Sequence, residues 1–106
     1  MSKYSAVRTE IDGYIFDSKR EAARYQDLKL LERVGYLTHL ELQPKYVVEI
    51  NGKKVCTVIP DFRYLTKDGK LVVEDAKGMR SGAAYQMFRL KAKLVEALFD
   101  IRIEEI

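Results

Sequence analysis

Cysteine and histidine are almost absent from this sequence, which contains one of each, Cys56 and His39. A single cysteine cannot form a disulfide within the chain, and together with one histidine it provides too few ligands for a structural zinc site of the usual kind. We therefore expect both residues to have structural roles. A hard cation held by carboxylate oxygens is not excluded, because Asp and Glu together number 16.

Long apolar runs are also missing. No segment approaches the roughly 20 apolar residues that a bilayer-spanning helix requires, so we expect no membrane partner. The first ten residues, MSKYSAVRTE, lack the apolar centre of a signal peptide, which predicts a cytoplasmic location. At 106 residues the chain is most simply one domain, 1–106, with a single modest core.

Positive charge is small in total but uneven along the chain. The formal net charge of +3 is too small to establish a nucleic-acid partner. Residues 77–93, however, contain five basic side chains and no acidic one, whereas residues 96–106 are rich in Asp and Glu. Such a basic block suits a phosphate backbone, and a solvated helix face accounts for it equally well.

Capping residues and apolar spacing predict two helices. Ser18 and Glu21 belong to a capping box, SKRE, and a glycine terminator follows, so the first helix should cover residues 18–35. A loop at 78–82 precedes the second helix, which should run to about Phe99 and bury one apolar stripe. That stripe consists of Ala84, Met87, Phe88, Leu94, Val95 and Leu98.

The remaining segments favour strands joined by tight turns, so the predicted class is α/β, a mixed β-sheet flanked by helices. The order is helix, three-stranded antiparallel meander, helix, strand, with the last strand parallel to the third strand of the meander. Turns are expected at Asn51-Gly52 and at 67–70. The expected strands are a lead-in within 1–16, then 38–50 with an interruption at Pro44, 53–65, 71–77 and the final IRIEEI.

Charged residues stand at the ends of two predicted neighbouring strands, as PD at 60–61 and DAK at 75–77. Asp75 and Lys77 are two residues apart, so both project from one face of their strand. Burying these charges in an apolar strand requires compensating partners. On an exposed face, by contrast, Asp75 would simply form an ion pair with Lys77 or Arg63.

The turn between these strands decides whether the two aspartates meet. A two-residue turn would send Asp61 and Asp75 to opposite faces of the sheet. A three-residue loop at 67–69, with Gly69 in the left-handed conformation of a bulge, pairs them directly, and we predict this loop. Glu74 points to the other face and is a poor candidate for the same site.

The blocks SKREAARY, LELQPKYVV, IPDFRY and VVEDAKG resemble those of a small phage-encoded family of unknown function that is assigned to the PD-(D/E)XK nuclease superfamily. The resemblance covers nearly the whole chain. More distantly, the chain is similar to endonucleases that cleave Holliday junctions or transposon ends. The core of the superfamily is restriction-endonuclease-like, with the element order αβββαβ that the pattern above also predicts.

The resemblance implies a binding site for Mg²⁺ or Mn²⁺. Asp61 and Asp75 would bind the ion together with Glu21, and the Ala76 carbonyl could add a ligand. Glu21 also has a simpler explanation, since its carboxylate can complete the capping box. Lys77 would hydrogen-bond the attacking water and stabilise developing negative charge, and this positioning role is favoured over that of a general base.

A set of substrate-binding residues is also implied. Lys91 falls in the apolar stripe of the second helix, where it could contact a phosphate or simply extend to solvent from the edge of the stripe. Gln43, before Pro44, recurs in the resembling family and could reach the site. Arg80, Arg89 and Lys93 are candidate phosphate contacts.

Together these features predict a Mg²⁺- or Mn²⁺-dependent endonuclease that hydrolyses phosphodiester bonds in DNA, by nicking or by selecting branched structures. The alternatives are a non-catalytic DNA-binding or assembly subunit with a nuclease fold, and an RNA nuclease. A homodimer would present two sites to two strands and a monomer would nick, and the sequence leaves both open. No small-molecule cofactor is expected, and a phage-encoded protein would act in the host cytoplasm.

Overall fold

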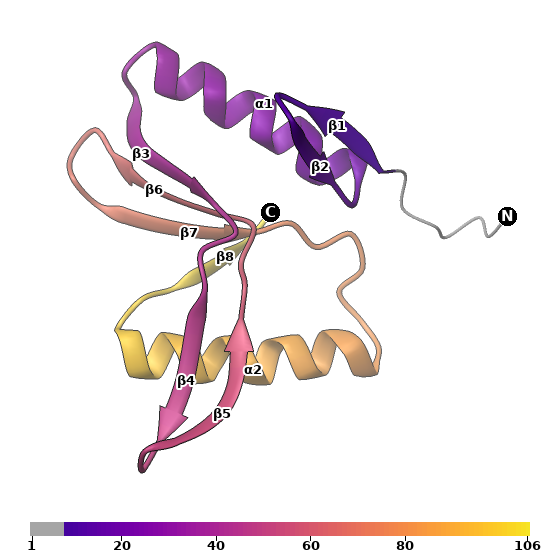
Figure 1. The fold of residues 1–106 in the computed structure, drawn as a ribbon, viewed down its shortest axis with the longest axis vertical. Coiled ribbons are helices and arrows are strands. Elements are labelled where there is room, and N and C mark those ends of the chain that lie inside the picture. Colours follow the sequence, from indigo (N-terminus) through magenta and orange to yellow (C-terminus); the bar gives the residue numbers. More distant parts are fainter. Residues whose placement is uncertain (1–7) are drawn as a thin grey trace, which may run out of the picture.

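The computed structural model describes residues 8–106, which form a mixed α/β fold (Figure 1). The part of the expected N-terminal lead-in that falls on residues 1–7 lies outside the described residues, and the part that follows is a short hairpin. In chain order the elements are β1 (Thr9–Ile11), β2 (Tyr14–Phe16), α1 (Lys19–Arg33), β3 (Leu37–Leu42), β4 (Tyr46–Ile50), β5 (Lys53–Val58), β6 (Phe62–Thr66), β7 (Leu71–Asp75), α2 (Ala83–Phe99) and β8 (Ile103–Glu105).

Helix α1 begins at the capping residue that the sequence predicts. The Ser18 hydroxyl oxygen accepts a hydrogen bond from the Glu21 N–H at 3.1 Å, which satisfies one of the free donors of the first turn. After the last helical residue, Arg33, Gly35 has a φ of +87°, a conformation that glycine adopts without strain. The predicted helix is confirmed, and it ends two residues earlier than expected.

The segment 38–50 is interrupted at Pro44, as predicted. The strand predicted at 53–65 is also split in two, which corrects the expected three-stranded meander. β3 pairs with β6 and β4 pairs with β5, both antiparallel. The two breaks fall at Pro44 and Pro60, which have no N–H to donate to a ladder. The chain leaves the main sheet there, and β4 and β5 form a separate two-stranded sheet, residues 46–58, which we call the β4–β5 ribbon.

The main sheet has the strand order β3-β6-β7-β8. β8 runs parallel to β7, as predicted for the last strand, while the other pairs are antiparallel. The β6–β7 connection is the predicted three-residue loop, since the Thr66 N–H donates to the Lys70 carbonyl oxygen at 2.8 Å and Gly69 has a φ of +82°. With the helices, the main-sheet strands follow the predicted order of helix, three strands, helix, strand.

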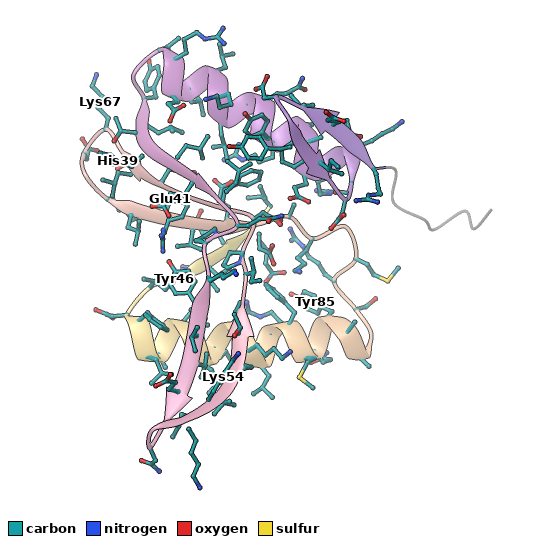
Figure 2. All side chains as sticks on the ribbon, viewed as in Figure 1. His39, Glu41, Tyr46, Lys54, Lys67 and Tyr85 are labelled. Carbon is teal, nitrogen blue, oxygen red and sulfur yellow. The ribbon has the colours of Figure 1, made fainter. Side chains whose placement is uncertain are left out.

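The single histidine and the single cysteine lie on different strands. His39 is exposed on β3 (Figure 2), with its Nδ1 3.0 Å from the Thr38 hydroxyl oxygen. Cys56, on β5, is a half-buried free thiol at the edge of an apolar core. Neither belongs to a group of metal ligands within residues 8–106.

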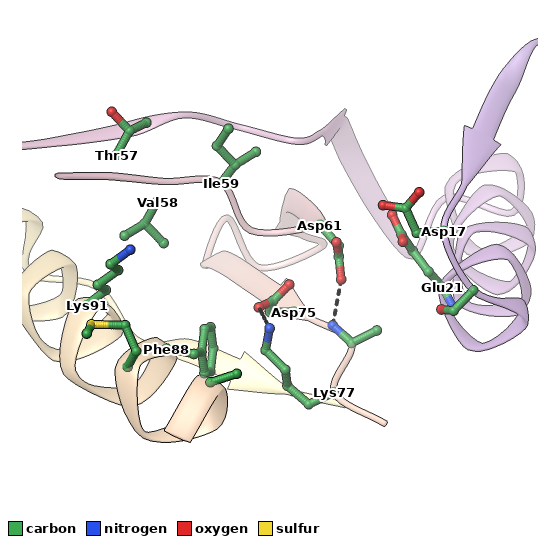
Figure 3. A pocket seen from close by; sticks show the side chains of 14 residues that line it. Asp17, Glu21, Thr57, Val58, Ile59, Asp61, Asp75, Lys77, Phe88 and Lys91 are labelled. Carbon is green, nitrogen blue, oxygen red and sulfur yellow. Dashed lines mark hydrogen bonds and ion pairs between the residues drawn. The ribbon is translucent and has the colours of Figure 1, made fainter. Parts of the chain in front are cut away.

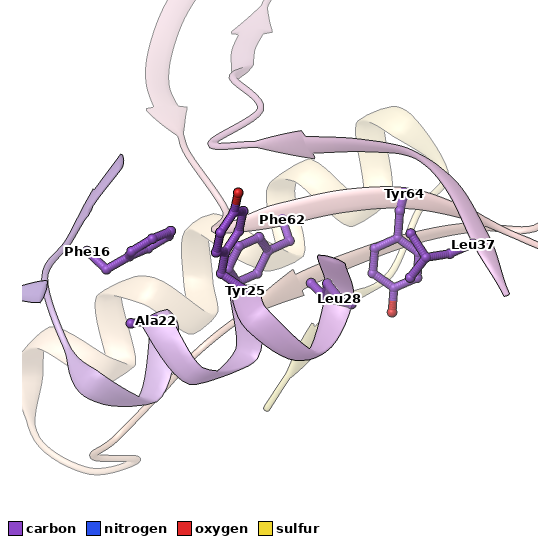
Figure 4. Close-up of a cluster of buried hydrophobic side chains, with 7 residues drawn as sticks. All are labelled: Phe16, Ala22, Tyr25, Leu28, Leu37, Phe62 and Tyr64. Carbon is purple, nitrogen blue, oxygen red and sulfur yellow. The ribbon is translucent and has the colours of Figure 1, made fainter. Parts of the chain in front are cut away.

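Each face of the main sheet carries one helix and one apolar core, because side chains alternate along the strands. On the first face, Tyr25 and Leu28 of α1 pack against Phe62 and Tyr64 of β6 (Figure 4). On the second face, α2 packs against the sheet, and the β4–β5 ribbon packs against α2. This second core consists of Tyr46, Val48, Val58, Val73, Ala92, Val95 and Ile103.

The apolar stripe predicted for α2 is only partly buried. Val95 is buried, but Met87 and Leu98 are 52% and 50% exposed, and Ala84 is exposed as well. The β4–β5 ribbon crosses α2 (Figure 1), and the Tyr46 ring of β4 packs against Phe99 at the end of the helix, with 5.1 Å between the ring centroids. The core that the ribbon forms with α2 contains Ala92 and Val95 but neither Met87 nor Leu98. Neither helix in the described part of the chain has the length and apolar character needed to cross a bilayer.

Candidate active site

A cavity of about 480 Å³ lies at the end of β7, between the start of α1, the first half of α2 and the segment joining β5 to β6 (Figure 3). It gathers the four predicted catalytic residues and adds one aspartate that sequence reasoning missed. The charged side chains that line it are Asp17, Glu21, Asp61, Asp75, Lys77 and Lys91.

The β6–β7 register brings Asp61 beside Asp75. Phe62 pairs with Glu74, and the Asp61 N–H donates to the Glu74 carbonyl oxygen at 3.0 Å. The Asp61 carboxylate accepts the Ala76 N–H at 2.7 Å, which fixes it against the end of β7. The predicted alignment of the two aspartates is thus confirmed. This alignment depends on the three-residue turn, because a register slip of one residue would place the Asp61 and Asp75 side chains on opposite faces of the sheet.

Lys77 is held from two sides. Its Nζ lies 2.9 Å from Oδ2 of Asp75 and 3.9 Å from the centroid of the Phe88 ring, so the ammonium has both an ion pair and a cation–π contact. The Lys77 N–H donates to the Ile106 carbonyl oxygen at 3.1 Å, and the Ile106 N–H donates to the Asp75 carbonyl oxygen at 3.0 Å. The ladder between β7 and the C-terminal strand therefore continues past Asp75 and positions the lysine backbone.

An ordinary surface ion pair does not describe Asp75. The residue is only 6% exposed, although it does pair with Lys77. Arg63, the other partner considered, instead binds Glu41 of β3. Glu74 points to the opposite face, as predicted, and accepts two hydrogen bonds from Arg24 there.

Glu21 enters the cavity from the first turn of α1. It is 7% exposed, and burial, followed by the nearby Asp17 charge, raises the pKa of its carboxyl group. Hydrogen bonds to the Asp61 side chain and to the Asp17 backbone act in the opposite direction. The carboxylate thus contacts Asp61, and its backbone partner is Asp17, the residue before the N-cap, rather than Ser18 itself, which a complete capping box requires.

Asp17 is the cavity carboxylate that sequence reasoning missed. It is exposed and directly precedes the N-cap Ser18. Its place in the sequence offered a clue, because an acidic side chain immediately before a helix tends to lie near the positive end of the helix dipole.

The carboxylates repel one another in the metal-free protein. Burial raises the pKa of Asp61 to about 8, and its hydrogen bond with Asp75 and the Asp75 charge add to the increase. Oxygen donors are the ligands that Mg²⁺ and Mn²⁺ prefer, and a divalent cation would relieve this repulsion. Within residues 8–106, no three such side chains are already gathered around one point. The cavity therefore offers donors of the chemical type that suits such an ion, whereas their arrangement in this structure does not surround one.

Replacing Asp61 with asparagine should stabilise the metal-free protein at alkaline pH. Because the folded-state pKa of Asp61 is about 8 and the ordinary value is 3.8, the unfolded chain releases this proton first and stability falls as pH rises between those values. Asparagine keeps an acceptor for the Ala76 N–H and removes the charge. We expect the unfolding free energy of the variant at pH 8 in EDTA to exceed that of wild type by about 1–2 kcal/mol. This gain is smaller than the full pKa shift implies because solvent screens part of the repulsion.

Denaturant melts of both proteins from pH 4 to 8 measure this difference, which should shrink toward pH 4, because Asp61 is then protonated in the folded state and partly protonated in the unfolded state as well. Asp68→Asn, in the exposed β6–β7 turn, serves as control and should change the unfolding free energy by less than about 0.5 kcal/mol. A destabilised Asp61→Asn protein at pH 8 would contradict the account of the cluster.

Among the predicted substrate-binding residues, Lys91 lines the cavity. Figure 3 shows its amine directed from α2 toward β5. Gln43 is exposed and does not line the cavity, and its connection to the site is through the backbone. Its N–H donates to the Asp61 carbonyl oxygen at 2.9 Å, so Gln43 helps to position Asp61.

The other three predicted phosphate contacts lie outside the cavity. Arg89 and Arg80 approach Glu105 of β8 at 3.1 and 3.8 Å and line a second cavity with it. Lys93 is exposed on α2. The sequence could not show that Glu105 would attract both arginines, because that pairing depends on β8 lying beside β7 and next to α2.

The fold and the cavity define a mixed α/β protein with a cluster of carboxylates and lysine at the end of an interior strand. The chain belongs to the family described as "Protein of unknown function (DUF1064)", which matches residues 1–105. No curated protein and no solved structure matches it.

Proposed function

We propose that this protein is a metal-dependent endonuclease that hydrolyses phosphodiester bonds in DNA, acting in the cytoplasm. The observation that carries the proposal is that Asp61, Asp75 and Lys77 share one cavity with Glu21. Hydrolysis of a phosphodiester requires carboxylates that can hold a hard cation and a positive group beside them, and the cavity contains both.

The residues that would hold the ion are Asp61, Asp75 and Glu21, with the Ala76 carbonyl as a further candidate. When bound, Mg²⁺ or Mn²⁺ would neutralise charge on the phosphate and the leaving oxygen and make a bound water more acidic. Burial, together with the neighbouring Asp75 carboxylate, raises the pKa of Asp61, and both favour uptake of a cation because the ion replaces a shared proton as the compensating charge.

Lys77 would position the attacking water. Asp75 and the Phe88 ring restrict its ammonium, which can direct a remaining N–H into the cavity. Lys91, which lines the cavity from α2, would neutralise a phosphate oxygen of the substrate. These two side chains therefore supply orientation and charge that exist before the substrate arrives.

A cleavage panel tests the proposal. Wild-type protein is incubated with supercoiled, linear, nicked and four-way-junction DNA in Mg²⁺, in Mn²⁺ and in EDTA. We expect cleavage with either ion and none in EDTA. Asp61→Ala should be inactive, whereas Asp68→Ala, which removes an exposed carboxylate far from the cavity, should cut like wild type.

Equal products from wild type and Asp61→Ala, or no products from either, would refute the proposal. DNA binding without cleavage under all conditions would favour the non-catalytic subunit instead. Faster cleavage of a competing RNA of the same sequence would identify an RNA nuclease. Among DNA substrates, the ratio of nicked to linear product from supercoiled plasmid distinguishes single-strand from double-strand cutting.

A further inference from the structure

The β4–β5 ribbon is a distinct unit that projects from the body of the protein (Figure 1). Its base packs on α2 through Tyr46, Val48 and Val58. Every residue of its distal part, 49–55, is exposed. Packing in the second core therefore accounts for the apolar residues at the base of the ribbon, whereas the residues of the exposed tip do not contribute to that core.

The ribbon, taken together with the preceding Lys45, carries a net positive charge. Lys45, at its base, and Lys53 and Lys54, at its tip, are exposed, and Glu49 is its one acidic residue. Three lysines and one glutamate give +2 within 45–58, compared with +3 for the whole chain. A projecting element of this sign suits a polyanion.

The ribbon also leads directly into the candidate active site. β5 starts at the tip, and its last residues, Thr57 and Val58, together with Ile59, line the cavity. Two residues further on is Asp61. At about 3.3 Å per residue, the eight steps from Lys53 to Asp61 span at most about 26 Å, which equals the rise of about eight base pairs.

We propose that the β4–β5 ribbon lies in a groove of double-stranded DNA next to the phosphate held in the cavity. The inference rests on the proposed function and specifies its substrate as duplex on one side of the cut. A two-stranded ribbon fits the major groove, which is about 12 Å wide. The lysines at the tip then contact phosphates at the groove edges, at most about eight base pairs from the cleaved bond.

A second copy of the chain is the other occupant that the ribbon could accept. Val47, Ile50 and Val55 are 42%, 43% and 53% exposed, and two ribbons could cover these side chains mutually. In such a symmetric pair, however, each ribbon with its charge of +2 would face another of the same charge. DNA neutralises that charge, and the apolar side chains can contact thymine methyl groups.

Equilibrium binding without cleavage tests the inference. Fluorescence anisotropy in EDTA measures affinity for a labelled duplex of about 24 base pairs, from about 50 to 200 mM salt. The variants are Lys53→Ala with Lys54→Ala and, as matched control, Lys67→Ala with Lys70→Ala in the exposed β6–β7 turn. Figure 2 shows Lys54 and Lys67 at opposite ends of the molecule.

We expect the tip variant to bind the duplex roughly 10-fold more weakly at 100 mM salt, with a salt slope shallower by about two, and the control variant to bind like wild type. Glu49→Gln should act in the opposite direction and strengthen binding roughly 2-fold. Equal losses in both lysine pairs, an unchanged slope, or no duplex binding by wild type would overturn the inference. A dimer by solution mass measurement that dissociates in the tip variant would also overturn it.

These outcomes are separable from failure of the proposed function. Binding in EDTA does not depend on a metal ion or on turnover. A tip-specific loss of binding together with no cleavage in the panel refutes the nuclease and leaves the ribbon as a duplex-binding element. Cleavage that depends on Asp61, together with tip variants that bind like wild type, supports the nuclease and refutes the role of the ribbon.

Discussion

Replacing Asp75 with asparagine is expected to slow DNA cleavage on the order of 1,000-fold and to weaken Mn²⁺ binding. Asp75 is the carboxylate at the centre of the cavity: it contacts Asp61 on one side and holds the Lys77 ammonium at 2.9 Å on the other. Asparagine has a similar size but no charge. The substitution therefore weakens a cation site and also removes the ion-pair partner of Lys77. Single-turnover cleavage at saturating metal, together with Mn²⁺ titration, measures both effects.

Lys77→Ala provides the contrast. The lysine contacts Asp75 and Phe88 and would act on water or phosphate, so its loss should slow cleavage about 100-fold or more while Mn²⁺ affinity is retained or improved. Parallel losses of rate and metal affinity in both variants would contradict the division of roles. The melting temperature of each variant in EDTA serves as the control for correct folding.

Replacing Arg24 with alanine is expected to lower the free energy of unfolding by about 3–4 kcal/mol. Arg24 of α1 donates from Nε and Nη2 to the two carboxylate oxygens of Glu74 at 2.8 and 2.6 Å, and the Tyr64 hydroxyl donates to the same carboxylate. Glu74 is 1% exposed. Removing the guanidinium leaves a buried carboxylate with one neutral donor, and such a loss costs far more than the ion pair contributes.

Lys29→Ala is the matched control for Arg24→Ala. Lys29 is also a cation of α1 paired with a glutamate, Glu32 at 3.0 Å, but the side chains of this pair are 41% and 31% exposed. Its loss should cost less than about 0.5 kcal/mol. Urea denaturation measures the unfolding free energy of both variants. Similar losses in the two would contradict the claim that burial of Glu74 makes the Arg24 pair the more important one for stability.

The same ion pair connects the core to the site. Arg24 lies one helical turn after Glu21, and Glu74 directly precedes Asp75. The Arg24–Glu74 contact therefore fixes α1 on the sheet at the level of the cavity, on the face opposite to it. A change here would move Glu21 relative to the two aspartates, so loss of stability and loss of the site are expected together.

Features set by neighbouring residues could be predicted from the sequence. The start of α1 depends on Ser18 and its bond to the Glu21 N–H, and both lie within one turn. The alignment of Asp61 with Asp75 depends on the loop at 67–69, where Gly69 adopts the left-handed conformation. In both cases the deciding interaction spans few residues, so local stereochemistry was sufficient.

Features set by distant contacts could not be predicted in the same way. Pro44 and Pro60 indicate where the strands break, but only the packing of the ribbon on α2 shows that β4 and β5 leave the main sheet. Met87 and Leu98 remain exposed and lie outside the core that the ribbon forms with α2. Periodicity predicts an apolar stripe without showing which part of it will be covered.

Calorimetric titration of the metal-free protein with Mn²⁺ tests the central claim most directly. The claim is that Asp61 and Asp75, with Glu21, form one binding site for a hard cation. Saturable binding is expected for wild type and for Asp68→Asn, with affinity lower by at least about 10-fold in Asp61→Asn and in Asp75→Asn. Absence of binding by the wild type, or equal affinity in all four proteins, would contradict it.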